Sequence, residues 1–69
     1  MLQKAKVKET GEIIYVRPPY EGEYISSLYE PDYIRIDEKG NTIYFKDRTG
    51  LRQVYEYDKD EIELIDDDL

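Results

Sequence analysis

The stretch at residues 5–16, AKVKETGEIIYV, decides the fold of this chain because two runs of alternating polar and apolar residues flank Thr10-Gly11. Glycine tolerates a positive φ, which a two-residue hairpin turn requires. We therefore predict a tight β-hairpin in which Glu9 faces Glu12 and Val7 faces Ile14.

The two faces of this predicted hairpin differ in chemistry. Counting outward from the turn places four aliphatic residues on one face: Ala5, Val7, Ile14 and Val16. The other face carries Lys4, Lys6 and Lys8 beside Ile13, Tyr15 and Arg17. Because side chains alternate with a period of two, a slip of one residue would bury the lysines, so the pattern restricts the register.

A long loop follows the hairpin, because Pro18 and Pro19 cannot donate to a strand ladder. It runs to about Asp32 and is rich in tyrosine. Long loops are often functional, and tyrosine combines a large apolar ring with a hydrogen-bonding tip. We predict partner-binding residues here: Tyr20, Tyr24, Tyr29 and Tyr33. Other tyrosines are expected to be structural, first of all Tyr15, Tyr44 and Tyr55.

The remaining chain alternates in short runs that predict further strands. Residues 33–37 and 42–46 flank the turn sequence EKGN, which would pair Ile36 with Ile43 and Ile34 with Phe45 in the core. A second turn, DRTG at residues 47–50, leads to a strand over residues 51–57, whose facing the pattern leaves open. A charged connection at residues 58–60 precedes a last strand at 61–65.

These pieces predict an all-β fold, a small antiparallel barrel of five to six short strands in a single domain over residues 1–69, with an acidic tail at about 66–69. Their order, with a long loop after the first hairpin, a three-strand meander and a charged hop before the last strand, resembles that of SH3-like barrels. The opening KAKVKETGEIIYV and the ending YEYDKDEIELI resemble short bacterial and phage proteins with no assigned activity. That resemblance implies a fold and a setting, not a mechanism.

Composition excludes several function classes. The 69 residues include no cysteine and no histidine, so the usual nucleophile–base pairs and zinc ligands are missing. We expect no enzyme activity, no metal and no cofactor. No apolar run approaches the length of a membrane span and lysines interrupt the start, so a cytoplasmic protein without membrane contact is expected.

Charge separates the remaining hypotheses. The net charge is -7, and from residue 36 onward eleven acids oppose five basic residues, a net -6. Direct nucleic-acid binding, through Lys4, Lys6, Lys8 and Arg17 with Tyr15, is therefore the least favoured hypothesis. A protein-interaction module is favoured, with a homodimer also open. The alternative is an acidic mimic of nucleic acid that inhibits a host protein, through Asp58, Asp60, Glu61, Glu63, Asp66 and Asp67.

Overall fold

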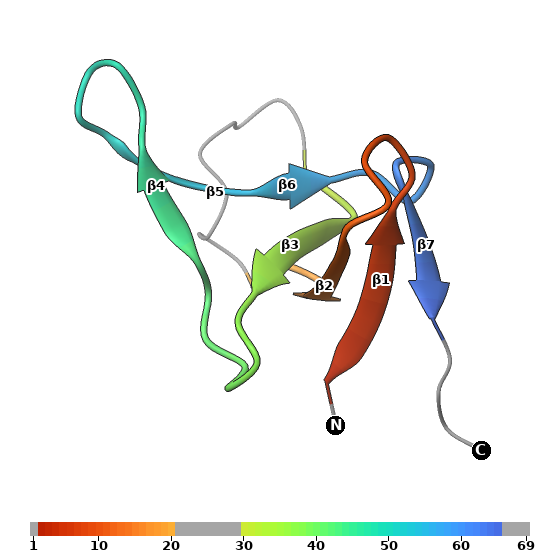
Figure 1. Cartoon of the computed structure of the whole chain (residues 1–69). Helices are drawn as coiled ribbons and strands as arrows, with labels where there is room; N and C mark the ends of the chain where they lie inside the picture. The colour runs from red at the N-terminus through yellow and green to blue at the C-terminus, as the bar shows by residue number, and fades with distance from the viewer. Residues whose placement is uncertain (1, 21–29, 66–69) are drawn as a thin grey trace.

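The computed structural model describes residues 2–20 and 30–65, and these contain strands and turns but no helix. The strands are β1 (Gln3–Val7), β2 (Ile13–Arg17), β3 (Tyr33–Ile36), β4 (Tyr44–Lys46), β5 (Arg52–Val54), β6 (Glu56–Tyr57) and β7 (Ile62–Ile65). Five of them form one antiparallel sheet in the order β6-β3-β2-β1-β7, and β4 and β5 form a separate hairpin (Figure 1). The predicted all-β architecture is confirmed. No helix capable of crossing a membrane occurs in these residues.

The first hairpin has the predicted faces but a different turn. Ala5 pairs with Ile14 and Lys4 with Tyr15, two residues away from the predicted register. The turn spans residues 8–11 and is closed by bonds from the Val7 N–H to the Glu12 carbonyl (2.8 Å) and from the Gly11 N–H to the Val7 carbonyl (2.7 Å). The prediction of a tight two-residue turn was wrong. A register shift of two residues nevertheless leaves each side chain on its predicted face.

The core lies on the aliphatic face of this hairpin, as the alternation predicts. Ala5, Ile14 and Val16 form a buried cluster with Ile62 of β7. Partly buried Val7, Tyr33 and Tyr57 pack against the cluster. The opening stretch therefore provides three of the four residues of this cluster, and the last strand provides the fourth. The other buried hydrophobic residues are Ile34, Ile36 and Val54.

The predicted second hairpin is wrong in register. Ile36 forms a bridge with Thr42 instead of pairing with Ile43. The reason is a five-residue turn at 37–41, in which Oδ1 of Asp37 accepts the N–H groups of Lys39 and Asn41, both at 2.8 Å. Beyond this turn β4 pairs with β5 and not with β3, so Tyr44 and Phe45 are both exposed and Phe45 is absent from the core.

The predicted strand at 51–57 changes partner at Tyr55. Before it, β5 pairs with β4; after it, β6 pairs with β3, with Tyr33 opposite Tyr57. The Arg35 N–H bonds to the Tyr55 carbonyl at 3.0 Å and holds this junction to the sheet. The sequence left open which side chains of this strand face the core, and in the structure Val54 is buried whereas Leu51 and Tyr55 are exposed. Figure 1 shows the β4–β5 hairpin reaching away from the other strands.

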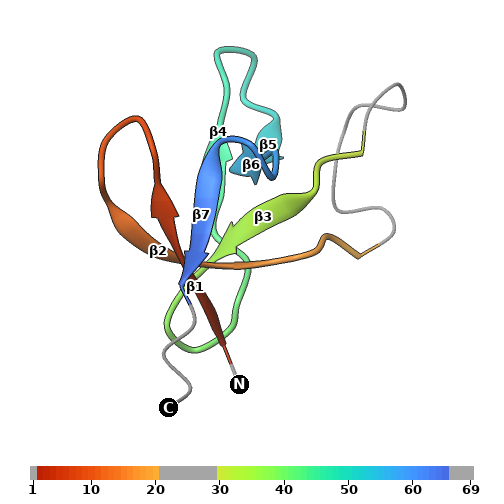
Figure 2. The same cartoon turned by 90° about the vertical axis from the view of Figure 1, so that its right-hand side faces the viewer.

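The sheet is strongly twisted and open. Figure 2 shows β7 running at a steep angle to β3. β6 and β7 are its two end strands, joined by a turn in which the Glu61 N–H bonds to the Asp58 carbonyl at 2.9 Å. Within residues 2–20 and 30–65 no strand pairing connects β6 to β7, so the predicted closure into a barrel is not observed.

Candidate functional site

The tyrosines predicted to bind a partner lie in different environments. Tyr20 is 67% exposed, and the guanidinium carbon of Arg17 lies 3.9 Å from its ring centroid. Tyr33 is half-buried against the core cluster, so part of its ring is structural. Tyr24 and Tyr29 lie outside the described residues. Only Tyr20 therefore offers a largely exposed ring among the predicted residues that the structure describes.

The acidic residues of the alternative hypothesis lie around the turn before β7. The Asp58 N–H bonds to Oε1 of Glu61 at 2.9 Å, so the Glu61 carboxylate closes its own turn. Glu63 lies opposite Lys6 in the β1–β7 ladder. Asp60 is exposed, and Asp66 and Asp67 lie outside the described residues. This arrangement places several carboxylates near cations or backbone donors of the same chain.

The structure reveals a different exposed surface on the β4–β5 hairpin. We call it the hairpin surface, and its members are Tyr44, Phe45, Leu51, Arg52 and Tyr55. Tyr44 and Phe45 are 46% and 38% exposed, and Leu51 is 60% exposed. Large apolar groups concentrated on one projecting element are typical of interaction sites, whereas isolated exposed ones are common.

Strand alternation divides these rings between two faces. Phe45 and Tyr55 lie together, with ring centroids 4.6 Å apart and planes tilted by 42°. On the other face, the guanidinium carbon of Arg52 lies 4.4 Å from the centroid of the Tyr44 ring. Both pairs restrain the side chains before any partner arrives, which lowers the entropy lost on binding.

Asp47 organises the tip of the hairpin. Its Oδ1 accepts the Thr49 N–H (2.8 Å), the Thr49 hydroxyl (2.6 Å) and the Leu51 N–H (3.0 Å). Its Oδ2 accepts the Gln53 side-chain amide at 2.8 Å. The hydrogen bonds from Thr49 and then Gln53 lower the pKa of Asp47 from 3.8 to about 2, because they stabilise the ionised form. The tip is therefore held by a charged carboxylate at neutral pH.

Two contacts of Arg35 connect the base of the hairpin to the sheet. Its guanidinium Nη2 lies 3.3 Å from Oε2 of Glu12, and its guanidinium carbon lies 5.8 Å from the centroid of the Tyr55 ring. Beside them, burial raises the pKa of Tyr57 above 10.0. Arg35, on β3, thus joins the turn before β2 to the segment where the hairpin leaves the sheet.

The hairpin differs from the rest of the protein in charge. Residues 44–55 contain Lys46, Arg48 and Arg52 against Asp47 alone, a net +2. Since the whole chain has -7, the remaining residues carry -7 minus +2, or -9. A basic, aromatic projection on an acidic body is the most distinctive surface of the described residues.

The sequence prediction missed this surface because it placed Phe45 in the core and treated Tyr44 and Tyr55 as structural. One signal was available. The turns at 37–41 and 47–51 share an Asp-x-x-Gly pattern and the same bonding, with an Asp Oδ1 accepting two backbone N–H groups. Treating both as five-residue turns would have moved Phe45 off the face of Ile34, but the exposure of Tyr44 follows only from the separation of the hairpin from the sheet.

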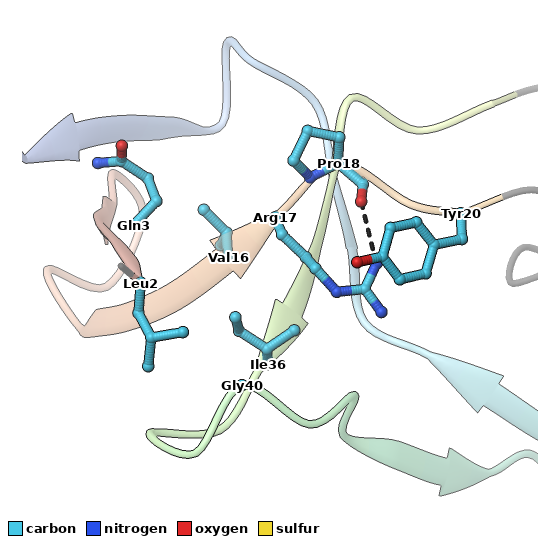
Figure 3. A pocket seen from close by; sticks show the side chains of 8 residues that line it. All are labelled: Leu2, Gln3, Val16, Arg17, Pro18, Tyr20, Ile36 and Gly40. Carbon is cyan, nitrogen blue, oxygen red and sulfur yellow. Dashed lines mark hydrogen bonds between the residues drawn. The ribbon is translucent and has the colours of Figure 1, made fainter.

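A pocket of about 350 Å³ lies beside β1, β2 and β3 (Figure 3). It is lined by Leu2, Gln3, Val16, Arg17, Pro18, Tyr20, Ile36 and Gly40. Its charged group, Arg17, donates to the Pro18 carbonyl (3.0 Å) and the Thr42 hydroxyl (2.8 Å) and stacks on Tyr20. Since these partners belong to the chain itself, we assign no ligand to this pocket.

In the described part of the chain, no three acidic side chains come close enough together to hold a metal ion. Compared with known proteins, the chain matches no family model, no curated protein and no solved structure.

Proposed function

We propose that this protein is a non-enzymatic interaction module that binds another protein through the hairpin surface. The observation that carries the proposal is the grouping of Tyr44, Phe45, Leu51 and Tyr55 on one projecting hairpin with three cations. Aromatic side chains supply much of the energy in protein interfaces, and arginine is enriched there with them.

The hairpin is suited to binding because its shape is set in advance. The Asp47 carboxylate accepts four hydrogen bonds from Thr49, Leu51 and Gln53. Tyrosine and phenylalanine also have only two side-chain torsions, so fixing them costs little entropy. A preorganised aromatic tip loses little conformational entropy on binding, so its contacts contribute more to affinity.

Charge indicates the chemistry of the partner. The hairpin carries +2, so it favours an acidic patch with apolar pockets for the rings. A nucleic acid would be attracted to the same hairpin, but the net charge of -9 on the remaining residues would repel its phosphates. We therefore favour an acidic protein over a polynucleotide.

The proposal extends to the fold and the setting. An SH3-like arrangement is supported by the strand order, in which β1, β2 and β3 form a meander and β7 returns to pair with β1. The resemblance of the chain ends to short bacterial and phage proteins supports a cytoplasmic accessory role in such a cell. Binding through the loop tyrosines Tyr20, Tyr24, Tyr29 and Tyr33 stays a prediction.

The acidic-mimic alternative has less support. Glu61 is engaged in its turn, and Glu63 lies across from Lys6, so these carboxylates do not form an uninterrupted acidic row. A mimic of nucleic acid needs a regular row of negative charge that a basic protein can follow. The alternative stays a prediction, and strongly salt-sensitive binding to a nucleic-acid enzyme would support it.

The test is photocrosslinking in a bacterial lysate, with a photoreactive phenylalanine in place of Tyr44. We expect a discrete crosslinked protein that is lost when Phe45→Ala or Arg52→Glu is added. Ile13→Ala is the matched control, because Ile13 is an exposed aliphatic residue on β2 and outside the hairpin. Circular dichroism would verify that every variant stays folded.

A second position separates this proposal from the loop prediction. Tyr20→Ala should leave the crosslinked product unchanged if the hairpin surface is the site. Loss of the product with Tyr20→Ala or Ile13→Ala, but not with Phe45→Ala, would reject the hairpin surface.

A further inference from the structure

The outer edge of β7 is a second surface with its own chemistry. β7 is an end strand of the five-stranded sheet, and within the described ranges it pairs only with β1. In Figure 1 it lies on the side of the sheet away from the β4–β5 hairpin. Its second edge therefore presents backbone groups that no described strand uses.

The ladder shows which backbone groups face outward. The bond from the Lys8 N–H to the Glu61 carbonyl (3.0 Å) marks Lys8 and Glu61 as a hydrogen-bonded pair. Such pairs alternate along an antiparallel ladder, so Lys6 and Glu63 form the next one. The pairs between them are not hydrogen-bonded, and the N–H and C=O groups of Ile62 and Leu64 therefore point away from β1.

The side chains along this edge alternate in the same way. Leu64 is 46% exposed although Ala5, its partner on β1, is fully buried. Ile62 belongs to the core cluster, while Glu61 and Glu63 are exposed on the opposite face. A strand added outside β7 would cover Leu64 and would bring its alternate residues beside the two glutamates.

A second copy of β7 is a poor occupant. The antiparallel register that hydrogen-bonds Ile62 to Leu64 of the second copy places Glu63 directly opposite Glu63 of that copy. This is a non-hydrogen-bonded pair, in which side chains are closest, and like charges there are destabilising. The edge therefore disfavours self-pairing and favours a strand of the opposite charge.

The chain already contains an example of the favoured pattern. On the inner edge, β1 places Lys6 opposite Glu63 and Val7 opposite Ile62. Residues 56–65 carry five acids and one lysine, a net -4, so the outer edge also lies in a negative field. From these observations we infer that the outer edge of β7 binds an extended segment of a partner protein in which basic and aliphatic residues alternate. The added strand places its basic residues beside Glu61 and Glu63 and its aliphatic residues beside Ile62 and Leu64.

The probe is an end-capped fluorescent peptide, Lys-Val-Lys-Val-Lys, measured by anisotropy and by amide NMR of the protein. We expect saturable binding with protection from hydrogen exchange at the Ile62 and Leu64 amides. A peptide N-methylated at its two valines keeps the charge but loses the backbone donors that face β7. It should bind about tenfold or more weakly, because each lost hydrogen bond costs about 1 kcal/mol.

Variants of the protein test the same geometry. Leu64→Pro removes only an N–H that points outward, so the β1 ladder stays intact and peptide binding should be lost. Leu64→Ala is the comparison variant: it keeps that N–H and loses only side-chain contact, so it should weaken peptide binding much less than Leu64→Pro does. If Leu64→Pro does not fold, Glu63→Lys provides the second test: it should bind the lysine peptide more weakly than the wild type does, because it sets like charges beside each other.

Several results would overturn the inference. Equal affinity of the N-methylated peptide would mean that charge attraction alone holds the peptide. Full binding by folded Leu64→Pro would exclude the outer edge, and loss of exchange protection in β1 would mean that the peptide replaces β1. Peptide binding that survives Phe45→Ala separates this surface from the hairpin surface.

Discussion

Asp47 accepts two hydrogen bonds from Thr49, one from its N–H at 2.8 Å and one from its hydroxyl at 2.6 Å. The conformation of the hairpin tip therefore depends on the charge of one partly exposed carboxylate. The same tip presents the aromatic residues that we propose as a binding surface, so its order and its function are linked.

Acid should loosen the hairpin tip at an unusually low pH. The pKa of Asp47 is about 2 in the folded protein against an ordinary 3.8, so its stabilising effect is present above pH 3.8. The effect is lost as the pH falls through about 2. The Thr49 and Leu51 amide shifts, followed by NMR, should titrate near pH 2, and Asp47→Asn should abolish this titration. A midpoint near 3.8 would show that the Asp47 carboxylate is not bonded as described.

Gly50→Ala should destabilise the hairpin by about 1 kcal/mol. Gly50 has a φ of 85°, and a Cβ there would meet nothing within 4 Å, so the cost is purely conformational. Gly50→Asn should cost less, because asparagine adopts the left-handed region more readily. The free energy of unfolding from urea titration measures both, and an alanine variant as stable as the wild type would contradict the turn geometry.

Ile34→Ala should destabilise the protein by about 2–5 kcal/mol, because it removes fully buried methyl groups and leaves a cavity. A domain of this size has little stability to lose, so the variant should be largely unfolded at moderate urea concentrations. Leu51→Ala, at a largely exposed position, should change stability by no more than about 0.5 kcal/mol. Similar losses at both positions would be inconsistent with the observed core.

Alkali should destabilise the fold through Tyr57. Burial raises the pKa of Tyr57 above its ordinary 10.0, so the unfolded state releases this proton first. The contribution to stability is present below pH 10.0 and is lost as the pH rises through the higher folded value. Tyr57→Phe should show a smaller fall in unfolding free energy over that range. An identical fall in both proteins would mean that Tyr57 ionises as freely when folded as when unfolded.

Local pattern alone predicted the all-β class and the facing of the first hairpin. Ala5, Ile14 and Val16 are buried as the alternation required, even though their register was two residues off. Side chains alternate between the two faces of a strand, so a register error of two residues leaves each side chain on its predicted face. The last strand was also predicted to within one residue, since Ile62–Ile65 follows a charged connection.

The candidate site depended mainly on which strands pair, and local pattern does not determine strand pairing. The β4 strand pairs with β5 and not with β3, so the hairpin leaves the sheet and both Tyr44 and Phe45 are exposed. Tyr55 lies between β5, which pairs with β4, and β6, which pairs with β3. Its position therefore depends on which strands pair. From the sequence alone, loop tyrosines such as Tyr20 were therefore the natural candidates.

The sequence by itself determined which residues alternate and where the chain turns, because both depend on neighbouring residues. Only the tertiary structure decided the length of each turn, the register it imposes and the partner of each strand. Turn length depends on side-chain hydrogen bonds within the turn, and the register and partner of a strand depend on which of several strands it pairs with. For the stretch at residues 5–16, alternation chose the buried face, and pairing with β3 and β7 decided what that face packs against.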